Sequence, residues 1–403
     1  MTTAESKNSI HKSGFGRRRL APRACIADRK AHLRTFMMES LEELGFVTSE
    51  CADTDELAPV LDAHQPDLVV LGSSIDGIEA GRIIEILAER RFDGQVLVIG
   101  PRESIMSHAI RRMGRERGIA MLPPLTTPFS AGTLRAGIAT LLPAEPIPSP
   151  AVDVGEALKL GWLELWYQRK LNTATLAPCG AEALIRMRHP SWGVVPPADF
   201  LPDPADAHFR ALSEFVVSRV IADWHYLVQQ QGPIDLSINL PAAFFDAADA
   251  VDDLCRWMPD HPAFGGLIIE IDCAEAIARL ARIVEVAKAL QLSNIAIAID
   301  SVGADWPALM DLPAAAFVEL KIDRQFIAGC ADDRLKQTVC RRIVEFAQSI
   351  GARSVANGVE SRADFRTVHQ IGVDLAQGYL FGKPMALKKF ARAASKHPML
   401  MHD

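Results

Sequence analysis

The chain has 403 residues, a formal net charge of −7, and 49% hydrophobic against 23% charged residues. This balance is typical of a globular protein of two to three domains, and it excludes a small disulfide-stabilised module and a wholly disordered chain. No apolar run is long enough to span a membrane, and the N-terminus lacks the apolar segment of a secretory signal. We therefore expect a cytoplasmic protein without membrane insertion. Seven scattered cysteines without C-x-x-C spacing favour reduced thiols over a zinc or disulfide framework.

The first part of the chain is predicted to be one α/β domain. Residues 1–22 are polar and rich in Ser, Gly and Arg, which indicates a flexible tail. Over residues 23–142, short β-branched runs alternate with longer amphipathic stretches, a pattern that predicts a flavodoxin-like doubly wound parallel sheet. In its first helical stretch, Phe36, Met37, Leu41 and Leu44 form an apolar face that could belong to the core or to an interface, and we expect the core. Four prolines crowd residues 143–150, so residues 143–154 are predicted to be a linker.

The second part, residues 155–395, again alternates strands and helices. Several strands, such as LIIEID, IAIAID and VELKID, are almost continuously apolar and end in polar residues. Strands of this kind are buried on both faces, and at this length they predict a (β/α)8 barrel with its chemistry at the strand tips. The tips present oxygen-rich side chains suited to a hard divalent cation, Mg²⁺ or Mn²⁺. These tip residues are Glu182, Asn239, Glu270, Asp300, Lys321 and Glu360. An acidic surface disfavours DNA binding.

The same segments carry a family resemblance. In order along the chain, GAEALIRMRHP, SINLP, LIIEIDCAE, IAIDSVGADWPAL, ELKIDRQFI and QGYLFGKPM resemble the motifs of EAL domains, which belong to bacterial cyclic di-GMP signalling. The resemblance implies an EAL-type barrel that binds cyclic di-GMP and usually hydrolyses it with two metal ions. It implies first-metal ligands at Glu182, Asn239, Glu270 and Asp300, a phosphate contact at Arg186, and a water-orienting or charge-stabilising role for Lys321. The nucleotide-binding positions implied in this way are Gln168, Glu182, Leu184, Arg186, Asn239, Asp300, Lys321, Gln377 and Gly378.

Four departures from the family pattern gather on the catalytic apparatus. Ser301 stands where the family has an Asp ligand of the second metal, and Asn357 stands where it has the general base. An amide cannot take a proton from an attacking water, a role worth roughly 10²–10⁴-fold in rate. The Glu that braces loop six is Cys273, and that loop now reads DSVGADWP, in which Trp306 could stack on a guanine or fill its pocket. We therefore predict a catalytically inactive domain with one remaining metal site, although Lys321 and Glu360 are retained.

The first domain resembles the receiver domain of response regulators in strand order and spacing. Its active positions differ: Asp28 is followed by Arg, Gly72 replaces the phosphoacceptor, and Thr127 replaces the lysine. The nearby Asp76 is interpreted as a turn residue of an Asp-Gly pair. The resemblance thus implies a pseudo-receiver that cannot accept phosphate and serves as a dimerisation or partner-docking module, so we expect a homodimer or a protein partner.

Three functions from different classes fit this sequence. The first is a receptor or regulatory module that binds cyclic di-GMP without cleaving it. The second is a weakly active phosphodiesterase in which Glu360 or a hydroxide replaces the base. The third is a protein scaffold that no longer binds nucleotide. The retained first-metal ligands favour the first function over the third, and Asn357 and Ser301 disfavour the second.

Overall fold

The computed structural model describes residues 21–394 except 73, 74, 76, 102, 103, 128, 130, 143–152 and 311–316. The chain divides into two compact units, one of residues 1–150 with 188–195 and one of residues 151–187 with 196–403. The predicted tail and linker fall almost wholly outside the described residues, and Asp76 does so too. Within the described ranges, no helix combines the length and apolar character needed to cross a membrane.

The first unit is built on a parallel sheet with strand order β2-β1-β3-β4-β5, to which β6 adds by pairing with β4. This is the flavodoxin-like order of a doubly wound sheet, as predicted. Near the end of the unit, β5 and β6 are two separate strands because Pro123 and Pro124, which have no N–H to donate, lie between them. The strands are β1 (Arg23–Ala27), β2 (Val47–Cys51), β3 (Leu68–Leu71), β4 (Gln95–Pro101), β5 (Ala120–Met121) and β6 (Leu125–Thr127).

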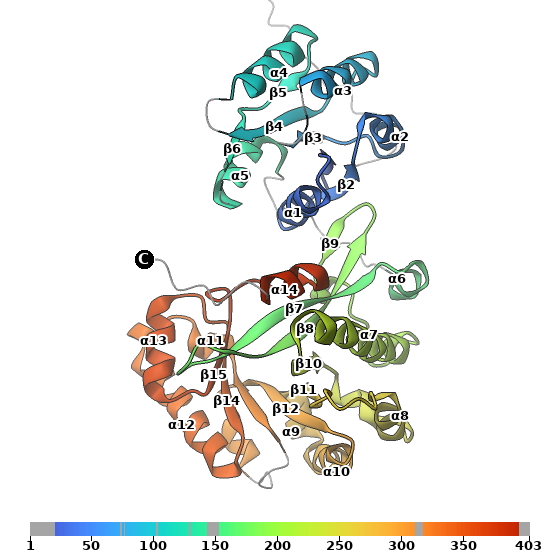
Figure 1. Cartoon of the computed structure of the whole chain (residues 1–403). Coiled ribbons are helices and arrows are strands. Elements are labelled where there is room, and N and C mark those ends of the chain that lie inside the picture. The colour runs from blue at the N-terminus through green and yellow to red at the C-terminus, as the bar shows by residue number, and fades with distance from the viewer. Residues whose placement is uncertain are drawn as a thin grey trace, which may run out of the picture. The chain divides into compact units, whose positions relative to one another are not determined.

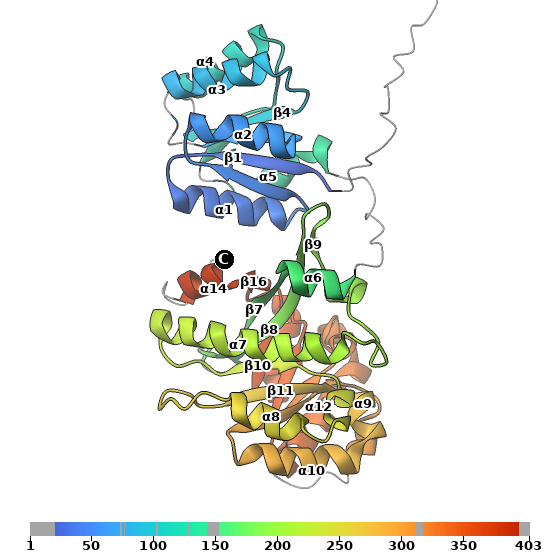
Figure 2. The same ribbon diagram turned by 90° about the vertical axis from the view of Figure 1, so that its right-hand side faces the viewer.

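Helices cover both faces of this sheet. They are α1 (Ala31–Glu42), α2 (Thr54–His64), α3 (Gly77–Glu89), α4 (Ile105–Glu116) and α5 (Ala131–Gly137), and a 3₁₀ turn, η1 (Ala139–Leu141), follows. One apolar core joins the sheet to α1 and α5, and a second joins it to α2, α3 and α4 (Figure 2). Met37 and Leu41 are buried in the first core and Leu44 packs against it, as predicted, but Phe36 is 46% exposed, so its assignment to the core was wrong.

The second unit is a closed barrel of eight strands, surrounded by helices (Figure 1). The strand order is β7-β15-β14-β13-β12-β11-β10-β8, and pairing of β8 with β7 closes it. The strands are β7 (Leu163–Asn172), β8 (Pro178–His189), β10 (Leu236–Asn239), β11 (Leu267–Asp272), β12 (Ile295–Val302), β13 (Glu319–Ile322), β14 (Arg353–Asn357) and β15 (Leu375–Gln377). Two short strands, β9 (Gly193–Val195) and β16 (Met385–Ala386), pair at the ends of this sheet path.

The helices of the second unit follow its strands along the chain. They are α6 (Val154–Leu160), α7 (Phe209–Gln231), α8 (Ala250–Trp257), α9 (Cys273–Ala278), α10 (Leu280–Gln291), α11 (Arg324–Ile327), α12 (Arg334–Ile350), α13 (Arg362–Ile371) and α14 (Leu387–Ala394). Short 3₁₀ turns are η2 (Pro197–Asp199), η3 (Ala242–Asp246), η4 (Trp306–Leu309) and η5 (Cys330–Asp332).

One strand departs from a regular (β/α)8 pattern. β7 runs antiparallel to both of its barrel neighbours, β8 and β15. A tight turn joins β7 to β8, and the side chain of Asn172 stabilises it by accepting hydrogen bonds from the backbone N–H groups of Ala174 and Thr175, at 3.0 and 2.9 Å. Because the two strands form a hairpin, no crossover helix separates them.

At the strand ends, acids that cap helices differ from charges that are buried inside the barrel. Asp272 and Asp323 accept hydrogen bonds from the first N–H groups of α9 and α11 and so act as helix N-caps. Glu270 and Lys321 lie two residues earlier in their strands and are buried inside the barrel. The interior charges are therefore the candidates for function.

Candidate functional site

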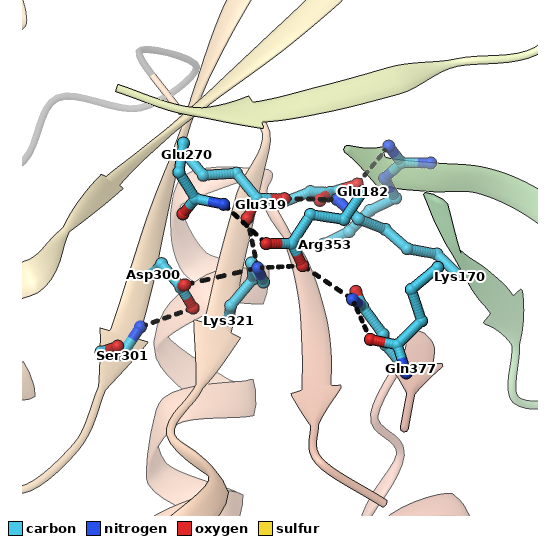
Figure 3. Close-up of polar contacts among 11 residues, drawn as sticks. Lys170, Glu182, Glu270, Asp300, Ser301, Glu319, Lys321, Arg353 and Gln377 are labelled. Carbon is cyan, nitrogen blue, oxygen red and sulfur yellow. Dashed lines mark hydrogen bonds and ion pairs between the residues drawn. The ribbon is translucent and has the colours of Figure 1, made fainter. Parts of the chain in front are cut away.

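A buried ionic cluster lies inside the barrel, with one charged side chain from each of four strands (Figure 3). The ammonium of Lys321 on β13 donates hydrogen bonds to Oε2 of Glu182 on β8, at 3.0 Å, and to Oε2 of Glu270 on β11. It also forms an ion pair with Oδ2 of Asp300 on β12, at 3.4 Å. The Lys321 side chain is completely buried, and this one cation contacts three carboxylates.

Amide side chains complete the surroundings of Glu182. Asn239 at the end of β10 donates to Glu182 Oε1 at 2.6 Å, and Gln377 at the end of β15 donates to Glu182 Oε2 at 2.7 Å. Gln377 also donates to Oε1 of Gln168 at 3.1 Å, and Gln168 donates to the backbone carbonyl of Gly382. The structure thus brings seven predicted site residues into one connected network: Gln168, Glu182, Asn239, Glu270, Asp300, Lys321 and Gln377.

A second set of buried charges adjoins this network and was not predicted. Lys170 on β7 donates to Glu270 Oε1 at 2.9 Å and to Glu319 Oε2 at 2.8 Å, and Arg353 donates to Glu319 Oε1 at 2.7 Å. The sequence carried one signal for it, because Glu319 lies two residues before Lys321 and therefore shares a strand face with it.

The electrostatics of the cluster are uneven. Burial, reinforced by the charge of Glu270, raises the pKa of Glu182, and burial likewise raises the pKa of Asp300, although Lys321 opposes both shifts. Burial also acts against the charge of Glu270, but Lys170 and Lys321 outweigh it and hold the pKa of that carboxyl well below its usual range. The two lysines therefore fully stabilise the charged form of Glu270 only. A further positive charge would stabilise the carboxylates of Glu182 and Asp300.

We tested whether these residues fit the divalent cations that the resemblance implies. Among the described residues, no three His, Cys, Asp or Glu side chains already surround a common point, because the Lys321 ammonium lies between the carboxylates. The donor set of three carboxylates and one amide nevertheless has the oxygen chemistry that suits one Mg²⁺ or Mn²⁺ beside this lysine.

The residues do not fit a second cation. Ser301 brings only a neutral hydroxyl, its backbone has a left-handed φ of 59°, and its N–H donates to Oδ1 of Asp300 at 2.7 Å. Oδ1 of Asp300 is thus already bound by the backbone. At position 301 the carboxylate that a second divalent ion would prefer as a ligand is missing.

The position of the family's general base lies at the same end of the barrel. Asn357 is half-buried at the end of β14 and pairs in register with Gln377. Gly358 follows with φ of 75°, and Glu360 beyond it forms an ion pair with Arg324 at 2.8 Å and is 43% exposed. The retained carboxylate of Glu360 is therefore bound to a surface arginine.

The remaining predicted binding residues surround the cluster. Leu184 and Arg186 follow Glu182 on the same face of β8, and the Arg186 guanidinium lies 5.9 Å from the ring centre of Trp166. Burial lowers the pKa of Arg186, which is half-buried. Gly378 has a φ of 157°, and a Cβ there would lie 2.2 Å from the carbonyl oxygen of Val359, so only glycine fits.

The rebuilt loop after β12 is packed onto the barrel. Trp306 lies against Phe346 of α12, with ring centres 5.9 Å apart, and it joins the edge of the barrel core. This contact holds the Trp306 ring against the barrel core. Cys273 is buried at the start of α9, where burial and nearby acids raise the pKa of its thiol to about 12.

The three positions at which the first unit departs from the receiver pattern also lie close together. Asp28, Gly72 and Thr127 lie at the carboxyl ends of β1, β3 and β6, and all three line one cavity. A Cβ built on Gly72 would lie 2.0 Å from Oδ2 of Asp28, so the Asp28 carboxylate occupies the space that any side chain at position 72 would need.

Incubation with acetyl phosphate and Mg²⁺ is expected to leave the first unit unmodified, because position 72 supplies no carboxylate. Intact-protein mass spectrometry, followed by mapping of any product, measures this directly. An Asp-phosphorylated peptide from residues 23–142 would contradict the expectation.

The buried acidic cluster lies at the carboxyl ends of the barrel strands, which is the end where α/β-barrel enzymes carry their active sites. The profile of the EAL domain matches residues 151–384, more than half of the chain, and the chain therefore belongs to the EAL domain family.

Relatives of the chain carry cyclic di-GMP names. It is 30% identical over 244 residues to the probable cyclic di-GMP phosphodiesterase PdeD of Escherichia coli, a match covering 60% of the chain and 45% of that relative. It is 26% identical over 361 residues to the cyclic di-GMP phosphodiesterase RocR of Pseudomonas aeruginosa, covering 85% of the chain and 90% of RocR. The chain thus spans less than half the length of PdeD and most of RocR.

Solved structures agree on the barrel. The PaMucR phosphodiesterase in complex with c-di-GMP is 28% identical, with a TM-score of 0.54, and the match covers 59% of this chain and 98% of that one. The EAL enzyme Bd1971 in its cGMP-bound form, at 23% identity and a TM-score of 0.55, shares the fold over 60% of this chain and 68% of its own.

Proposed function

We propose that the second unit binds cyclic di-GMP without hydrolysing it and that the protein acts as a receptor or regulatory module in cyclic di-GMP signalling. The observation that carries this proposal is the contrast within one site: Glu182, Glu270, Asp300 and Lys321 form an intact buried cluster, while Asn357 has replaced the general base. Binding and cleavage depend on different residues, since a base acts mainly in the transition state.

Ground-state binding would use groups that this chain retains. One divalent cation held by Glu182, Asn239, Glu270 and Asp300 would neutralise charge on a phosphodiester. Arg186 would donate charge-assisted hydrogen bonds to phosphate oxygens, and its burial strengthens such bonds by excluding water. The amide and hydroxyl at Asn357 and Ser301 remove two negative charges that would otherwise repel the anionic ligand.

The names of the relatives favour a second candidate, an active phosphodiesterase. In this reading another group would have to take the proton from water. The ion pair between Glu360 and Arg324 opposes the use of Glu360, because its carboxylate is already bound by an exposed arginine. We therefore rank hydrolysis second and a scaffold without nucleotide third.

The first unit would then supply the output. We propose that this pseudo-receiver acts in the cytoplasm as a dimerisation or partner-docking module. Sedimentation at micromolar protein concentration tests the homodimer, and a monomer at all concentrations would remove it from the proposal.

Calorimetric titration is expected to show cyclic di-GMP binding at micromolar concentrations or tighter, and Arg186→Ala is expected to weaken it roughly 10- to 100-fold, because a hydrogen bond to a charged group is lost. Arg186→Lys is the matched control and should retain part of the affinity, since it keeps the charge but not the bidentate geometry. Equal affinities in all three proteins would contradict the assigned phosphate contact.

Removal of divalent cations tests the proposed metal site. Titration in excess EDTA is expected to weaken cyclic di-GMP binding relative to titration in Mg²⁺ or Mn²⁺, because the cluster would then face the phosphates with its own negative charge. Glu182→Gln should reduce this dependence on metal. An affinity unaffected by EDTA would show that the nucleotide binds without a metal ion.

A further inference from the structure

The first unit contains a cavity of about 240 Å³ at the carboxyl ends of its parallel strands. In the sheet order β2-β1-β3, the chain connects β1 to β2 on one side and then crosses to β3 on the other side of β1. The cavity lies at this crossover point, where it is lined by Ile26 in β1, Asp28 after β1 and Gly72 after β3. In open α/β sheets, ligands bind at such reversal points, outside the carboxyl ends of the strands.

The walls of the cavity are apolar and partly aromatic. Phe36 and Met37 of α1, Ile99 of β4 and Phe129 contribute to the lining. The rings of Phe36 and Phe129 lie against each other, with centres 5.9 Å apart and planes tilted by 53°. Phe36 is 46% exposed and borders this cavity, whereas Met37 and Leu41 of the same helix are buried in the core.

The polar side chains that line the cavity are those of Asp28, after β1, and Thr127, at the end of β6. Asp28 is 1% exposed, its Oδ1 accepts a hydrogen bond from the N–H of Lys30 at 2.7 Å, and its Oδ2 lies over Gly72. Thr127 adds a hydroxyl. A largely apolar pocket with a few polar groups at one end is the usual form of a site for a small organic ligand.

Size and chemistry restrict the ligand. A dry apolar cavity of about 150 Å³ accommodates benzene, so this cavity has room for one aromatic ring with a short side chain. The carboxylate at its base favours a hydrogen-bond donor or a cation on that side chain and disfavours an anion, which would be repelled at close range.

We infer that the first unit is a binding site for a small aromatic molecule with a donor head group, such as an arylalkyl amine or a phenol, seated against the paired rings of Phe36 and Phe129 with its head group toward Asp28. Gly72 supplies no phosphoacceptor and leaves its space to the Asp28 carboxylate. This inference is independent of nucleotide binding by the barrel.

Methyl NMR on the full-length protein tests it, with ¹³C-labelled Met and Ile methyl groups and two probes of similar shape. Phenethylamine is expected to shift the methyl resonances of Met37, Ile26 and Ile99, and 3-phenylpropionate, which carries a carboxylate instead of the amine, is expected to bind at least about tenfold more weakly.

Two variants and one control decide the outcome. Phe36→Ala, at a half-exposed position that folding tolerates, should weaken phenethylamine binding roughly three- to tenfold through loss of a ring contact. Asp28→Asn should remove the preference for the amine, and Ile105→Ala, on an 87% exposed residue of the same unit that does not line the cavity, should change neither. The inference is overturned if neither probe shifts the cavity methyls at millimolar concentration, or if both variants bind phenethylamine as the unaltered protein does.

Discussion

Restoring both missing carboxylates, with Asn357→Glu and Ser301→Asp in one chain, is expected to raise hydrolysis of cyclic di-GMP by roughly 10²- to 10⁴-fold over the unaltered protein. Glu at position 357 would return a group able to take a proton from water, at the end of β14 beside Gln377. Asp at position 301 would add the carboxylate that a second cation needs, and Asp tolerates the left-handed backbone found there better than most residues. Chromatographic detection of the linear dinucleotide measures the rate.

The single variants and an uncharged control sharpen this prediction. Asn357→Glu alone should recover little activity, since the second cation would still lack its ligand. The pair Asn357→Gln and Ser301→Asn changes side-chain size similarly without adding charge, and it should stay inactive. If the uncharged pair gained as much activity as the charged pair, the loss of the two carboxylates would not be the reason for the low rate.

Lys321→Met is expected to lower the free energy of unfolding of the barrel by about 3–5 kcal/mol, because it leaves Glu182, Glu270 and Asp300 without their shared cation. Burial acts against the charge of Lys321, but the three carboxylates outweigh it and raise the pKa of Lys321 well above its ordinary value, so the lysine is charged throughout the neutral range. Urea unfolding in EDTA, followed by tryptophan fluorescence, measures the change. Five of the six tryptophans lie in the second unit, so the signal reports mainly on the barrel; the sixth, Trp192, lies in residues 188–195 of the first unit.

An exposed ion pair provides the control for this measurement. Arg342 pairs with Glu345 on the surface of α12 at 3.0 Å, with both side chains more than half exposed, and Arg342→Met should cost about 1 kcal/mol or less. A Lys321→Met protein as stable as the Arg342→Met protein would mean that the cluster is not held together by this lysine.

Much of the fold could be predicted because buried parallel strands have a distinctive pattern. Strands such as LIIEID and VELKID are mostly apolar, as expected of strands buried on both faces. Their alternation with helices indicated both sheets. The antiparallel β7 could not be predicted in this way, because direction depends on the turn at Asn172 and not on the strand's own composition. Phe36 was assigned to the core because helical periodicity does not distinguish a core from a cavity wall.

The convergence of the site followed from topology, since the carboxyl ends of neighbouring barrel strands meet at one end. What the sequence could not supply was the pairing of charges inside the barrel. Lys321 among the carboxylates and Lys170 between Glu270 and Glu319 depend on side-chain directions across strands far apart in the sequence. The cavity in the first unit likewise depends on how α1 packs against the strand ends.

The most direct test of the account follows cyclic di-GMP itself. The protein is titrated with the nucleotide in Mg²⁺ or Mn²⁺, and the same sample is then incubated and its nucleotide recovered and analysed. We predict saturable binding and recovery of intact cyclic di-GMP, at a rate of loss indistinguishable from that of a Glu182→Ala control. Metal-dependent conversion to the linear dinucleotide within about tenfold of the typical enzyme rate near 10 s⁻¹ would contradict the proposed function, and so would the absence of any binding.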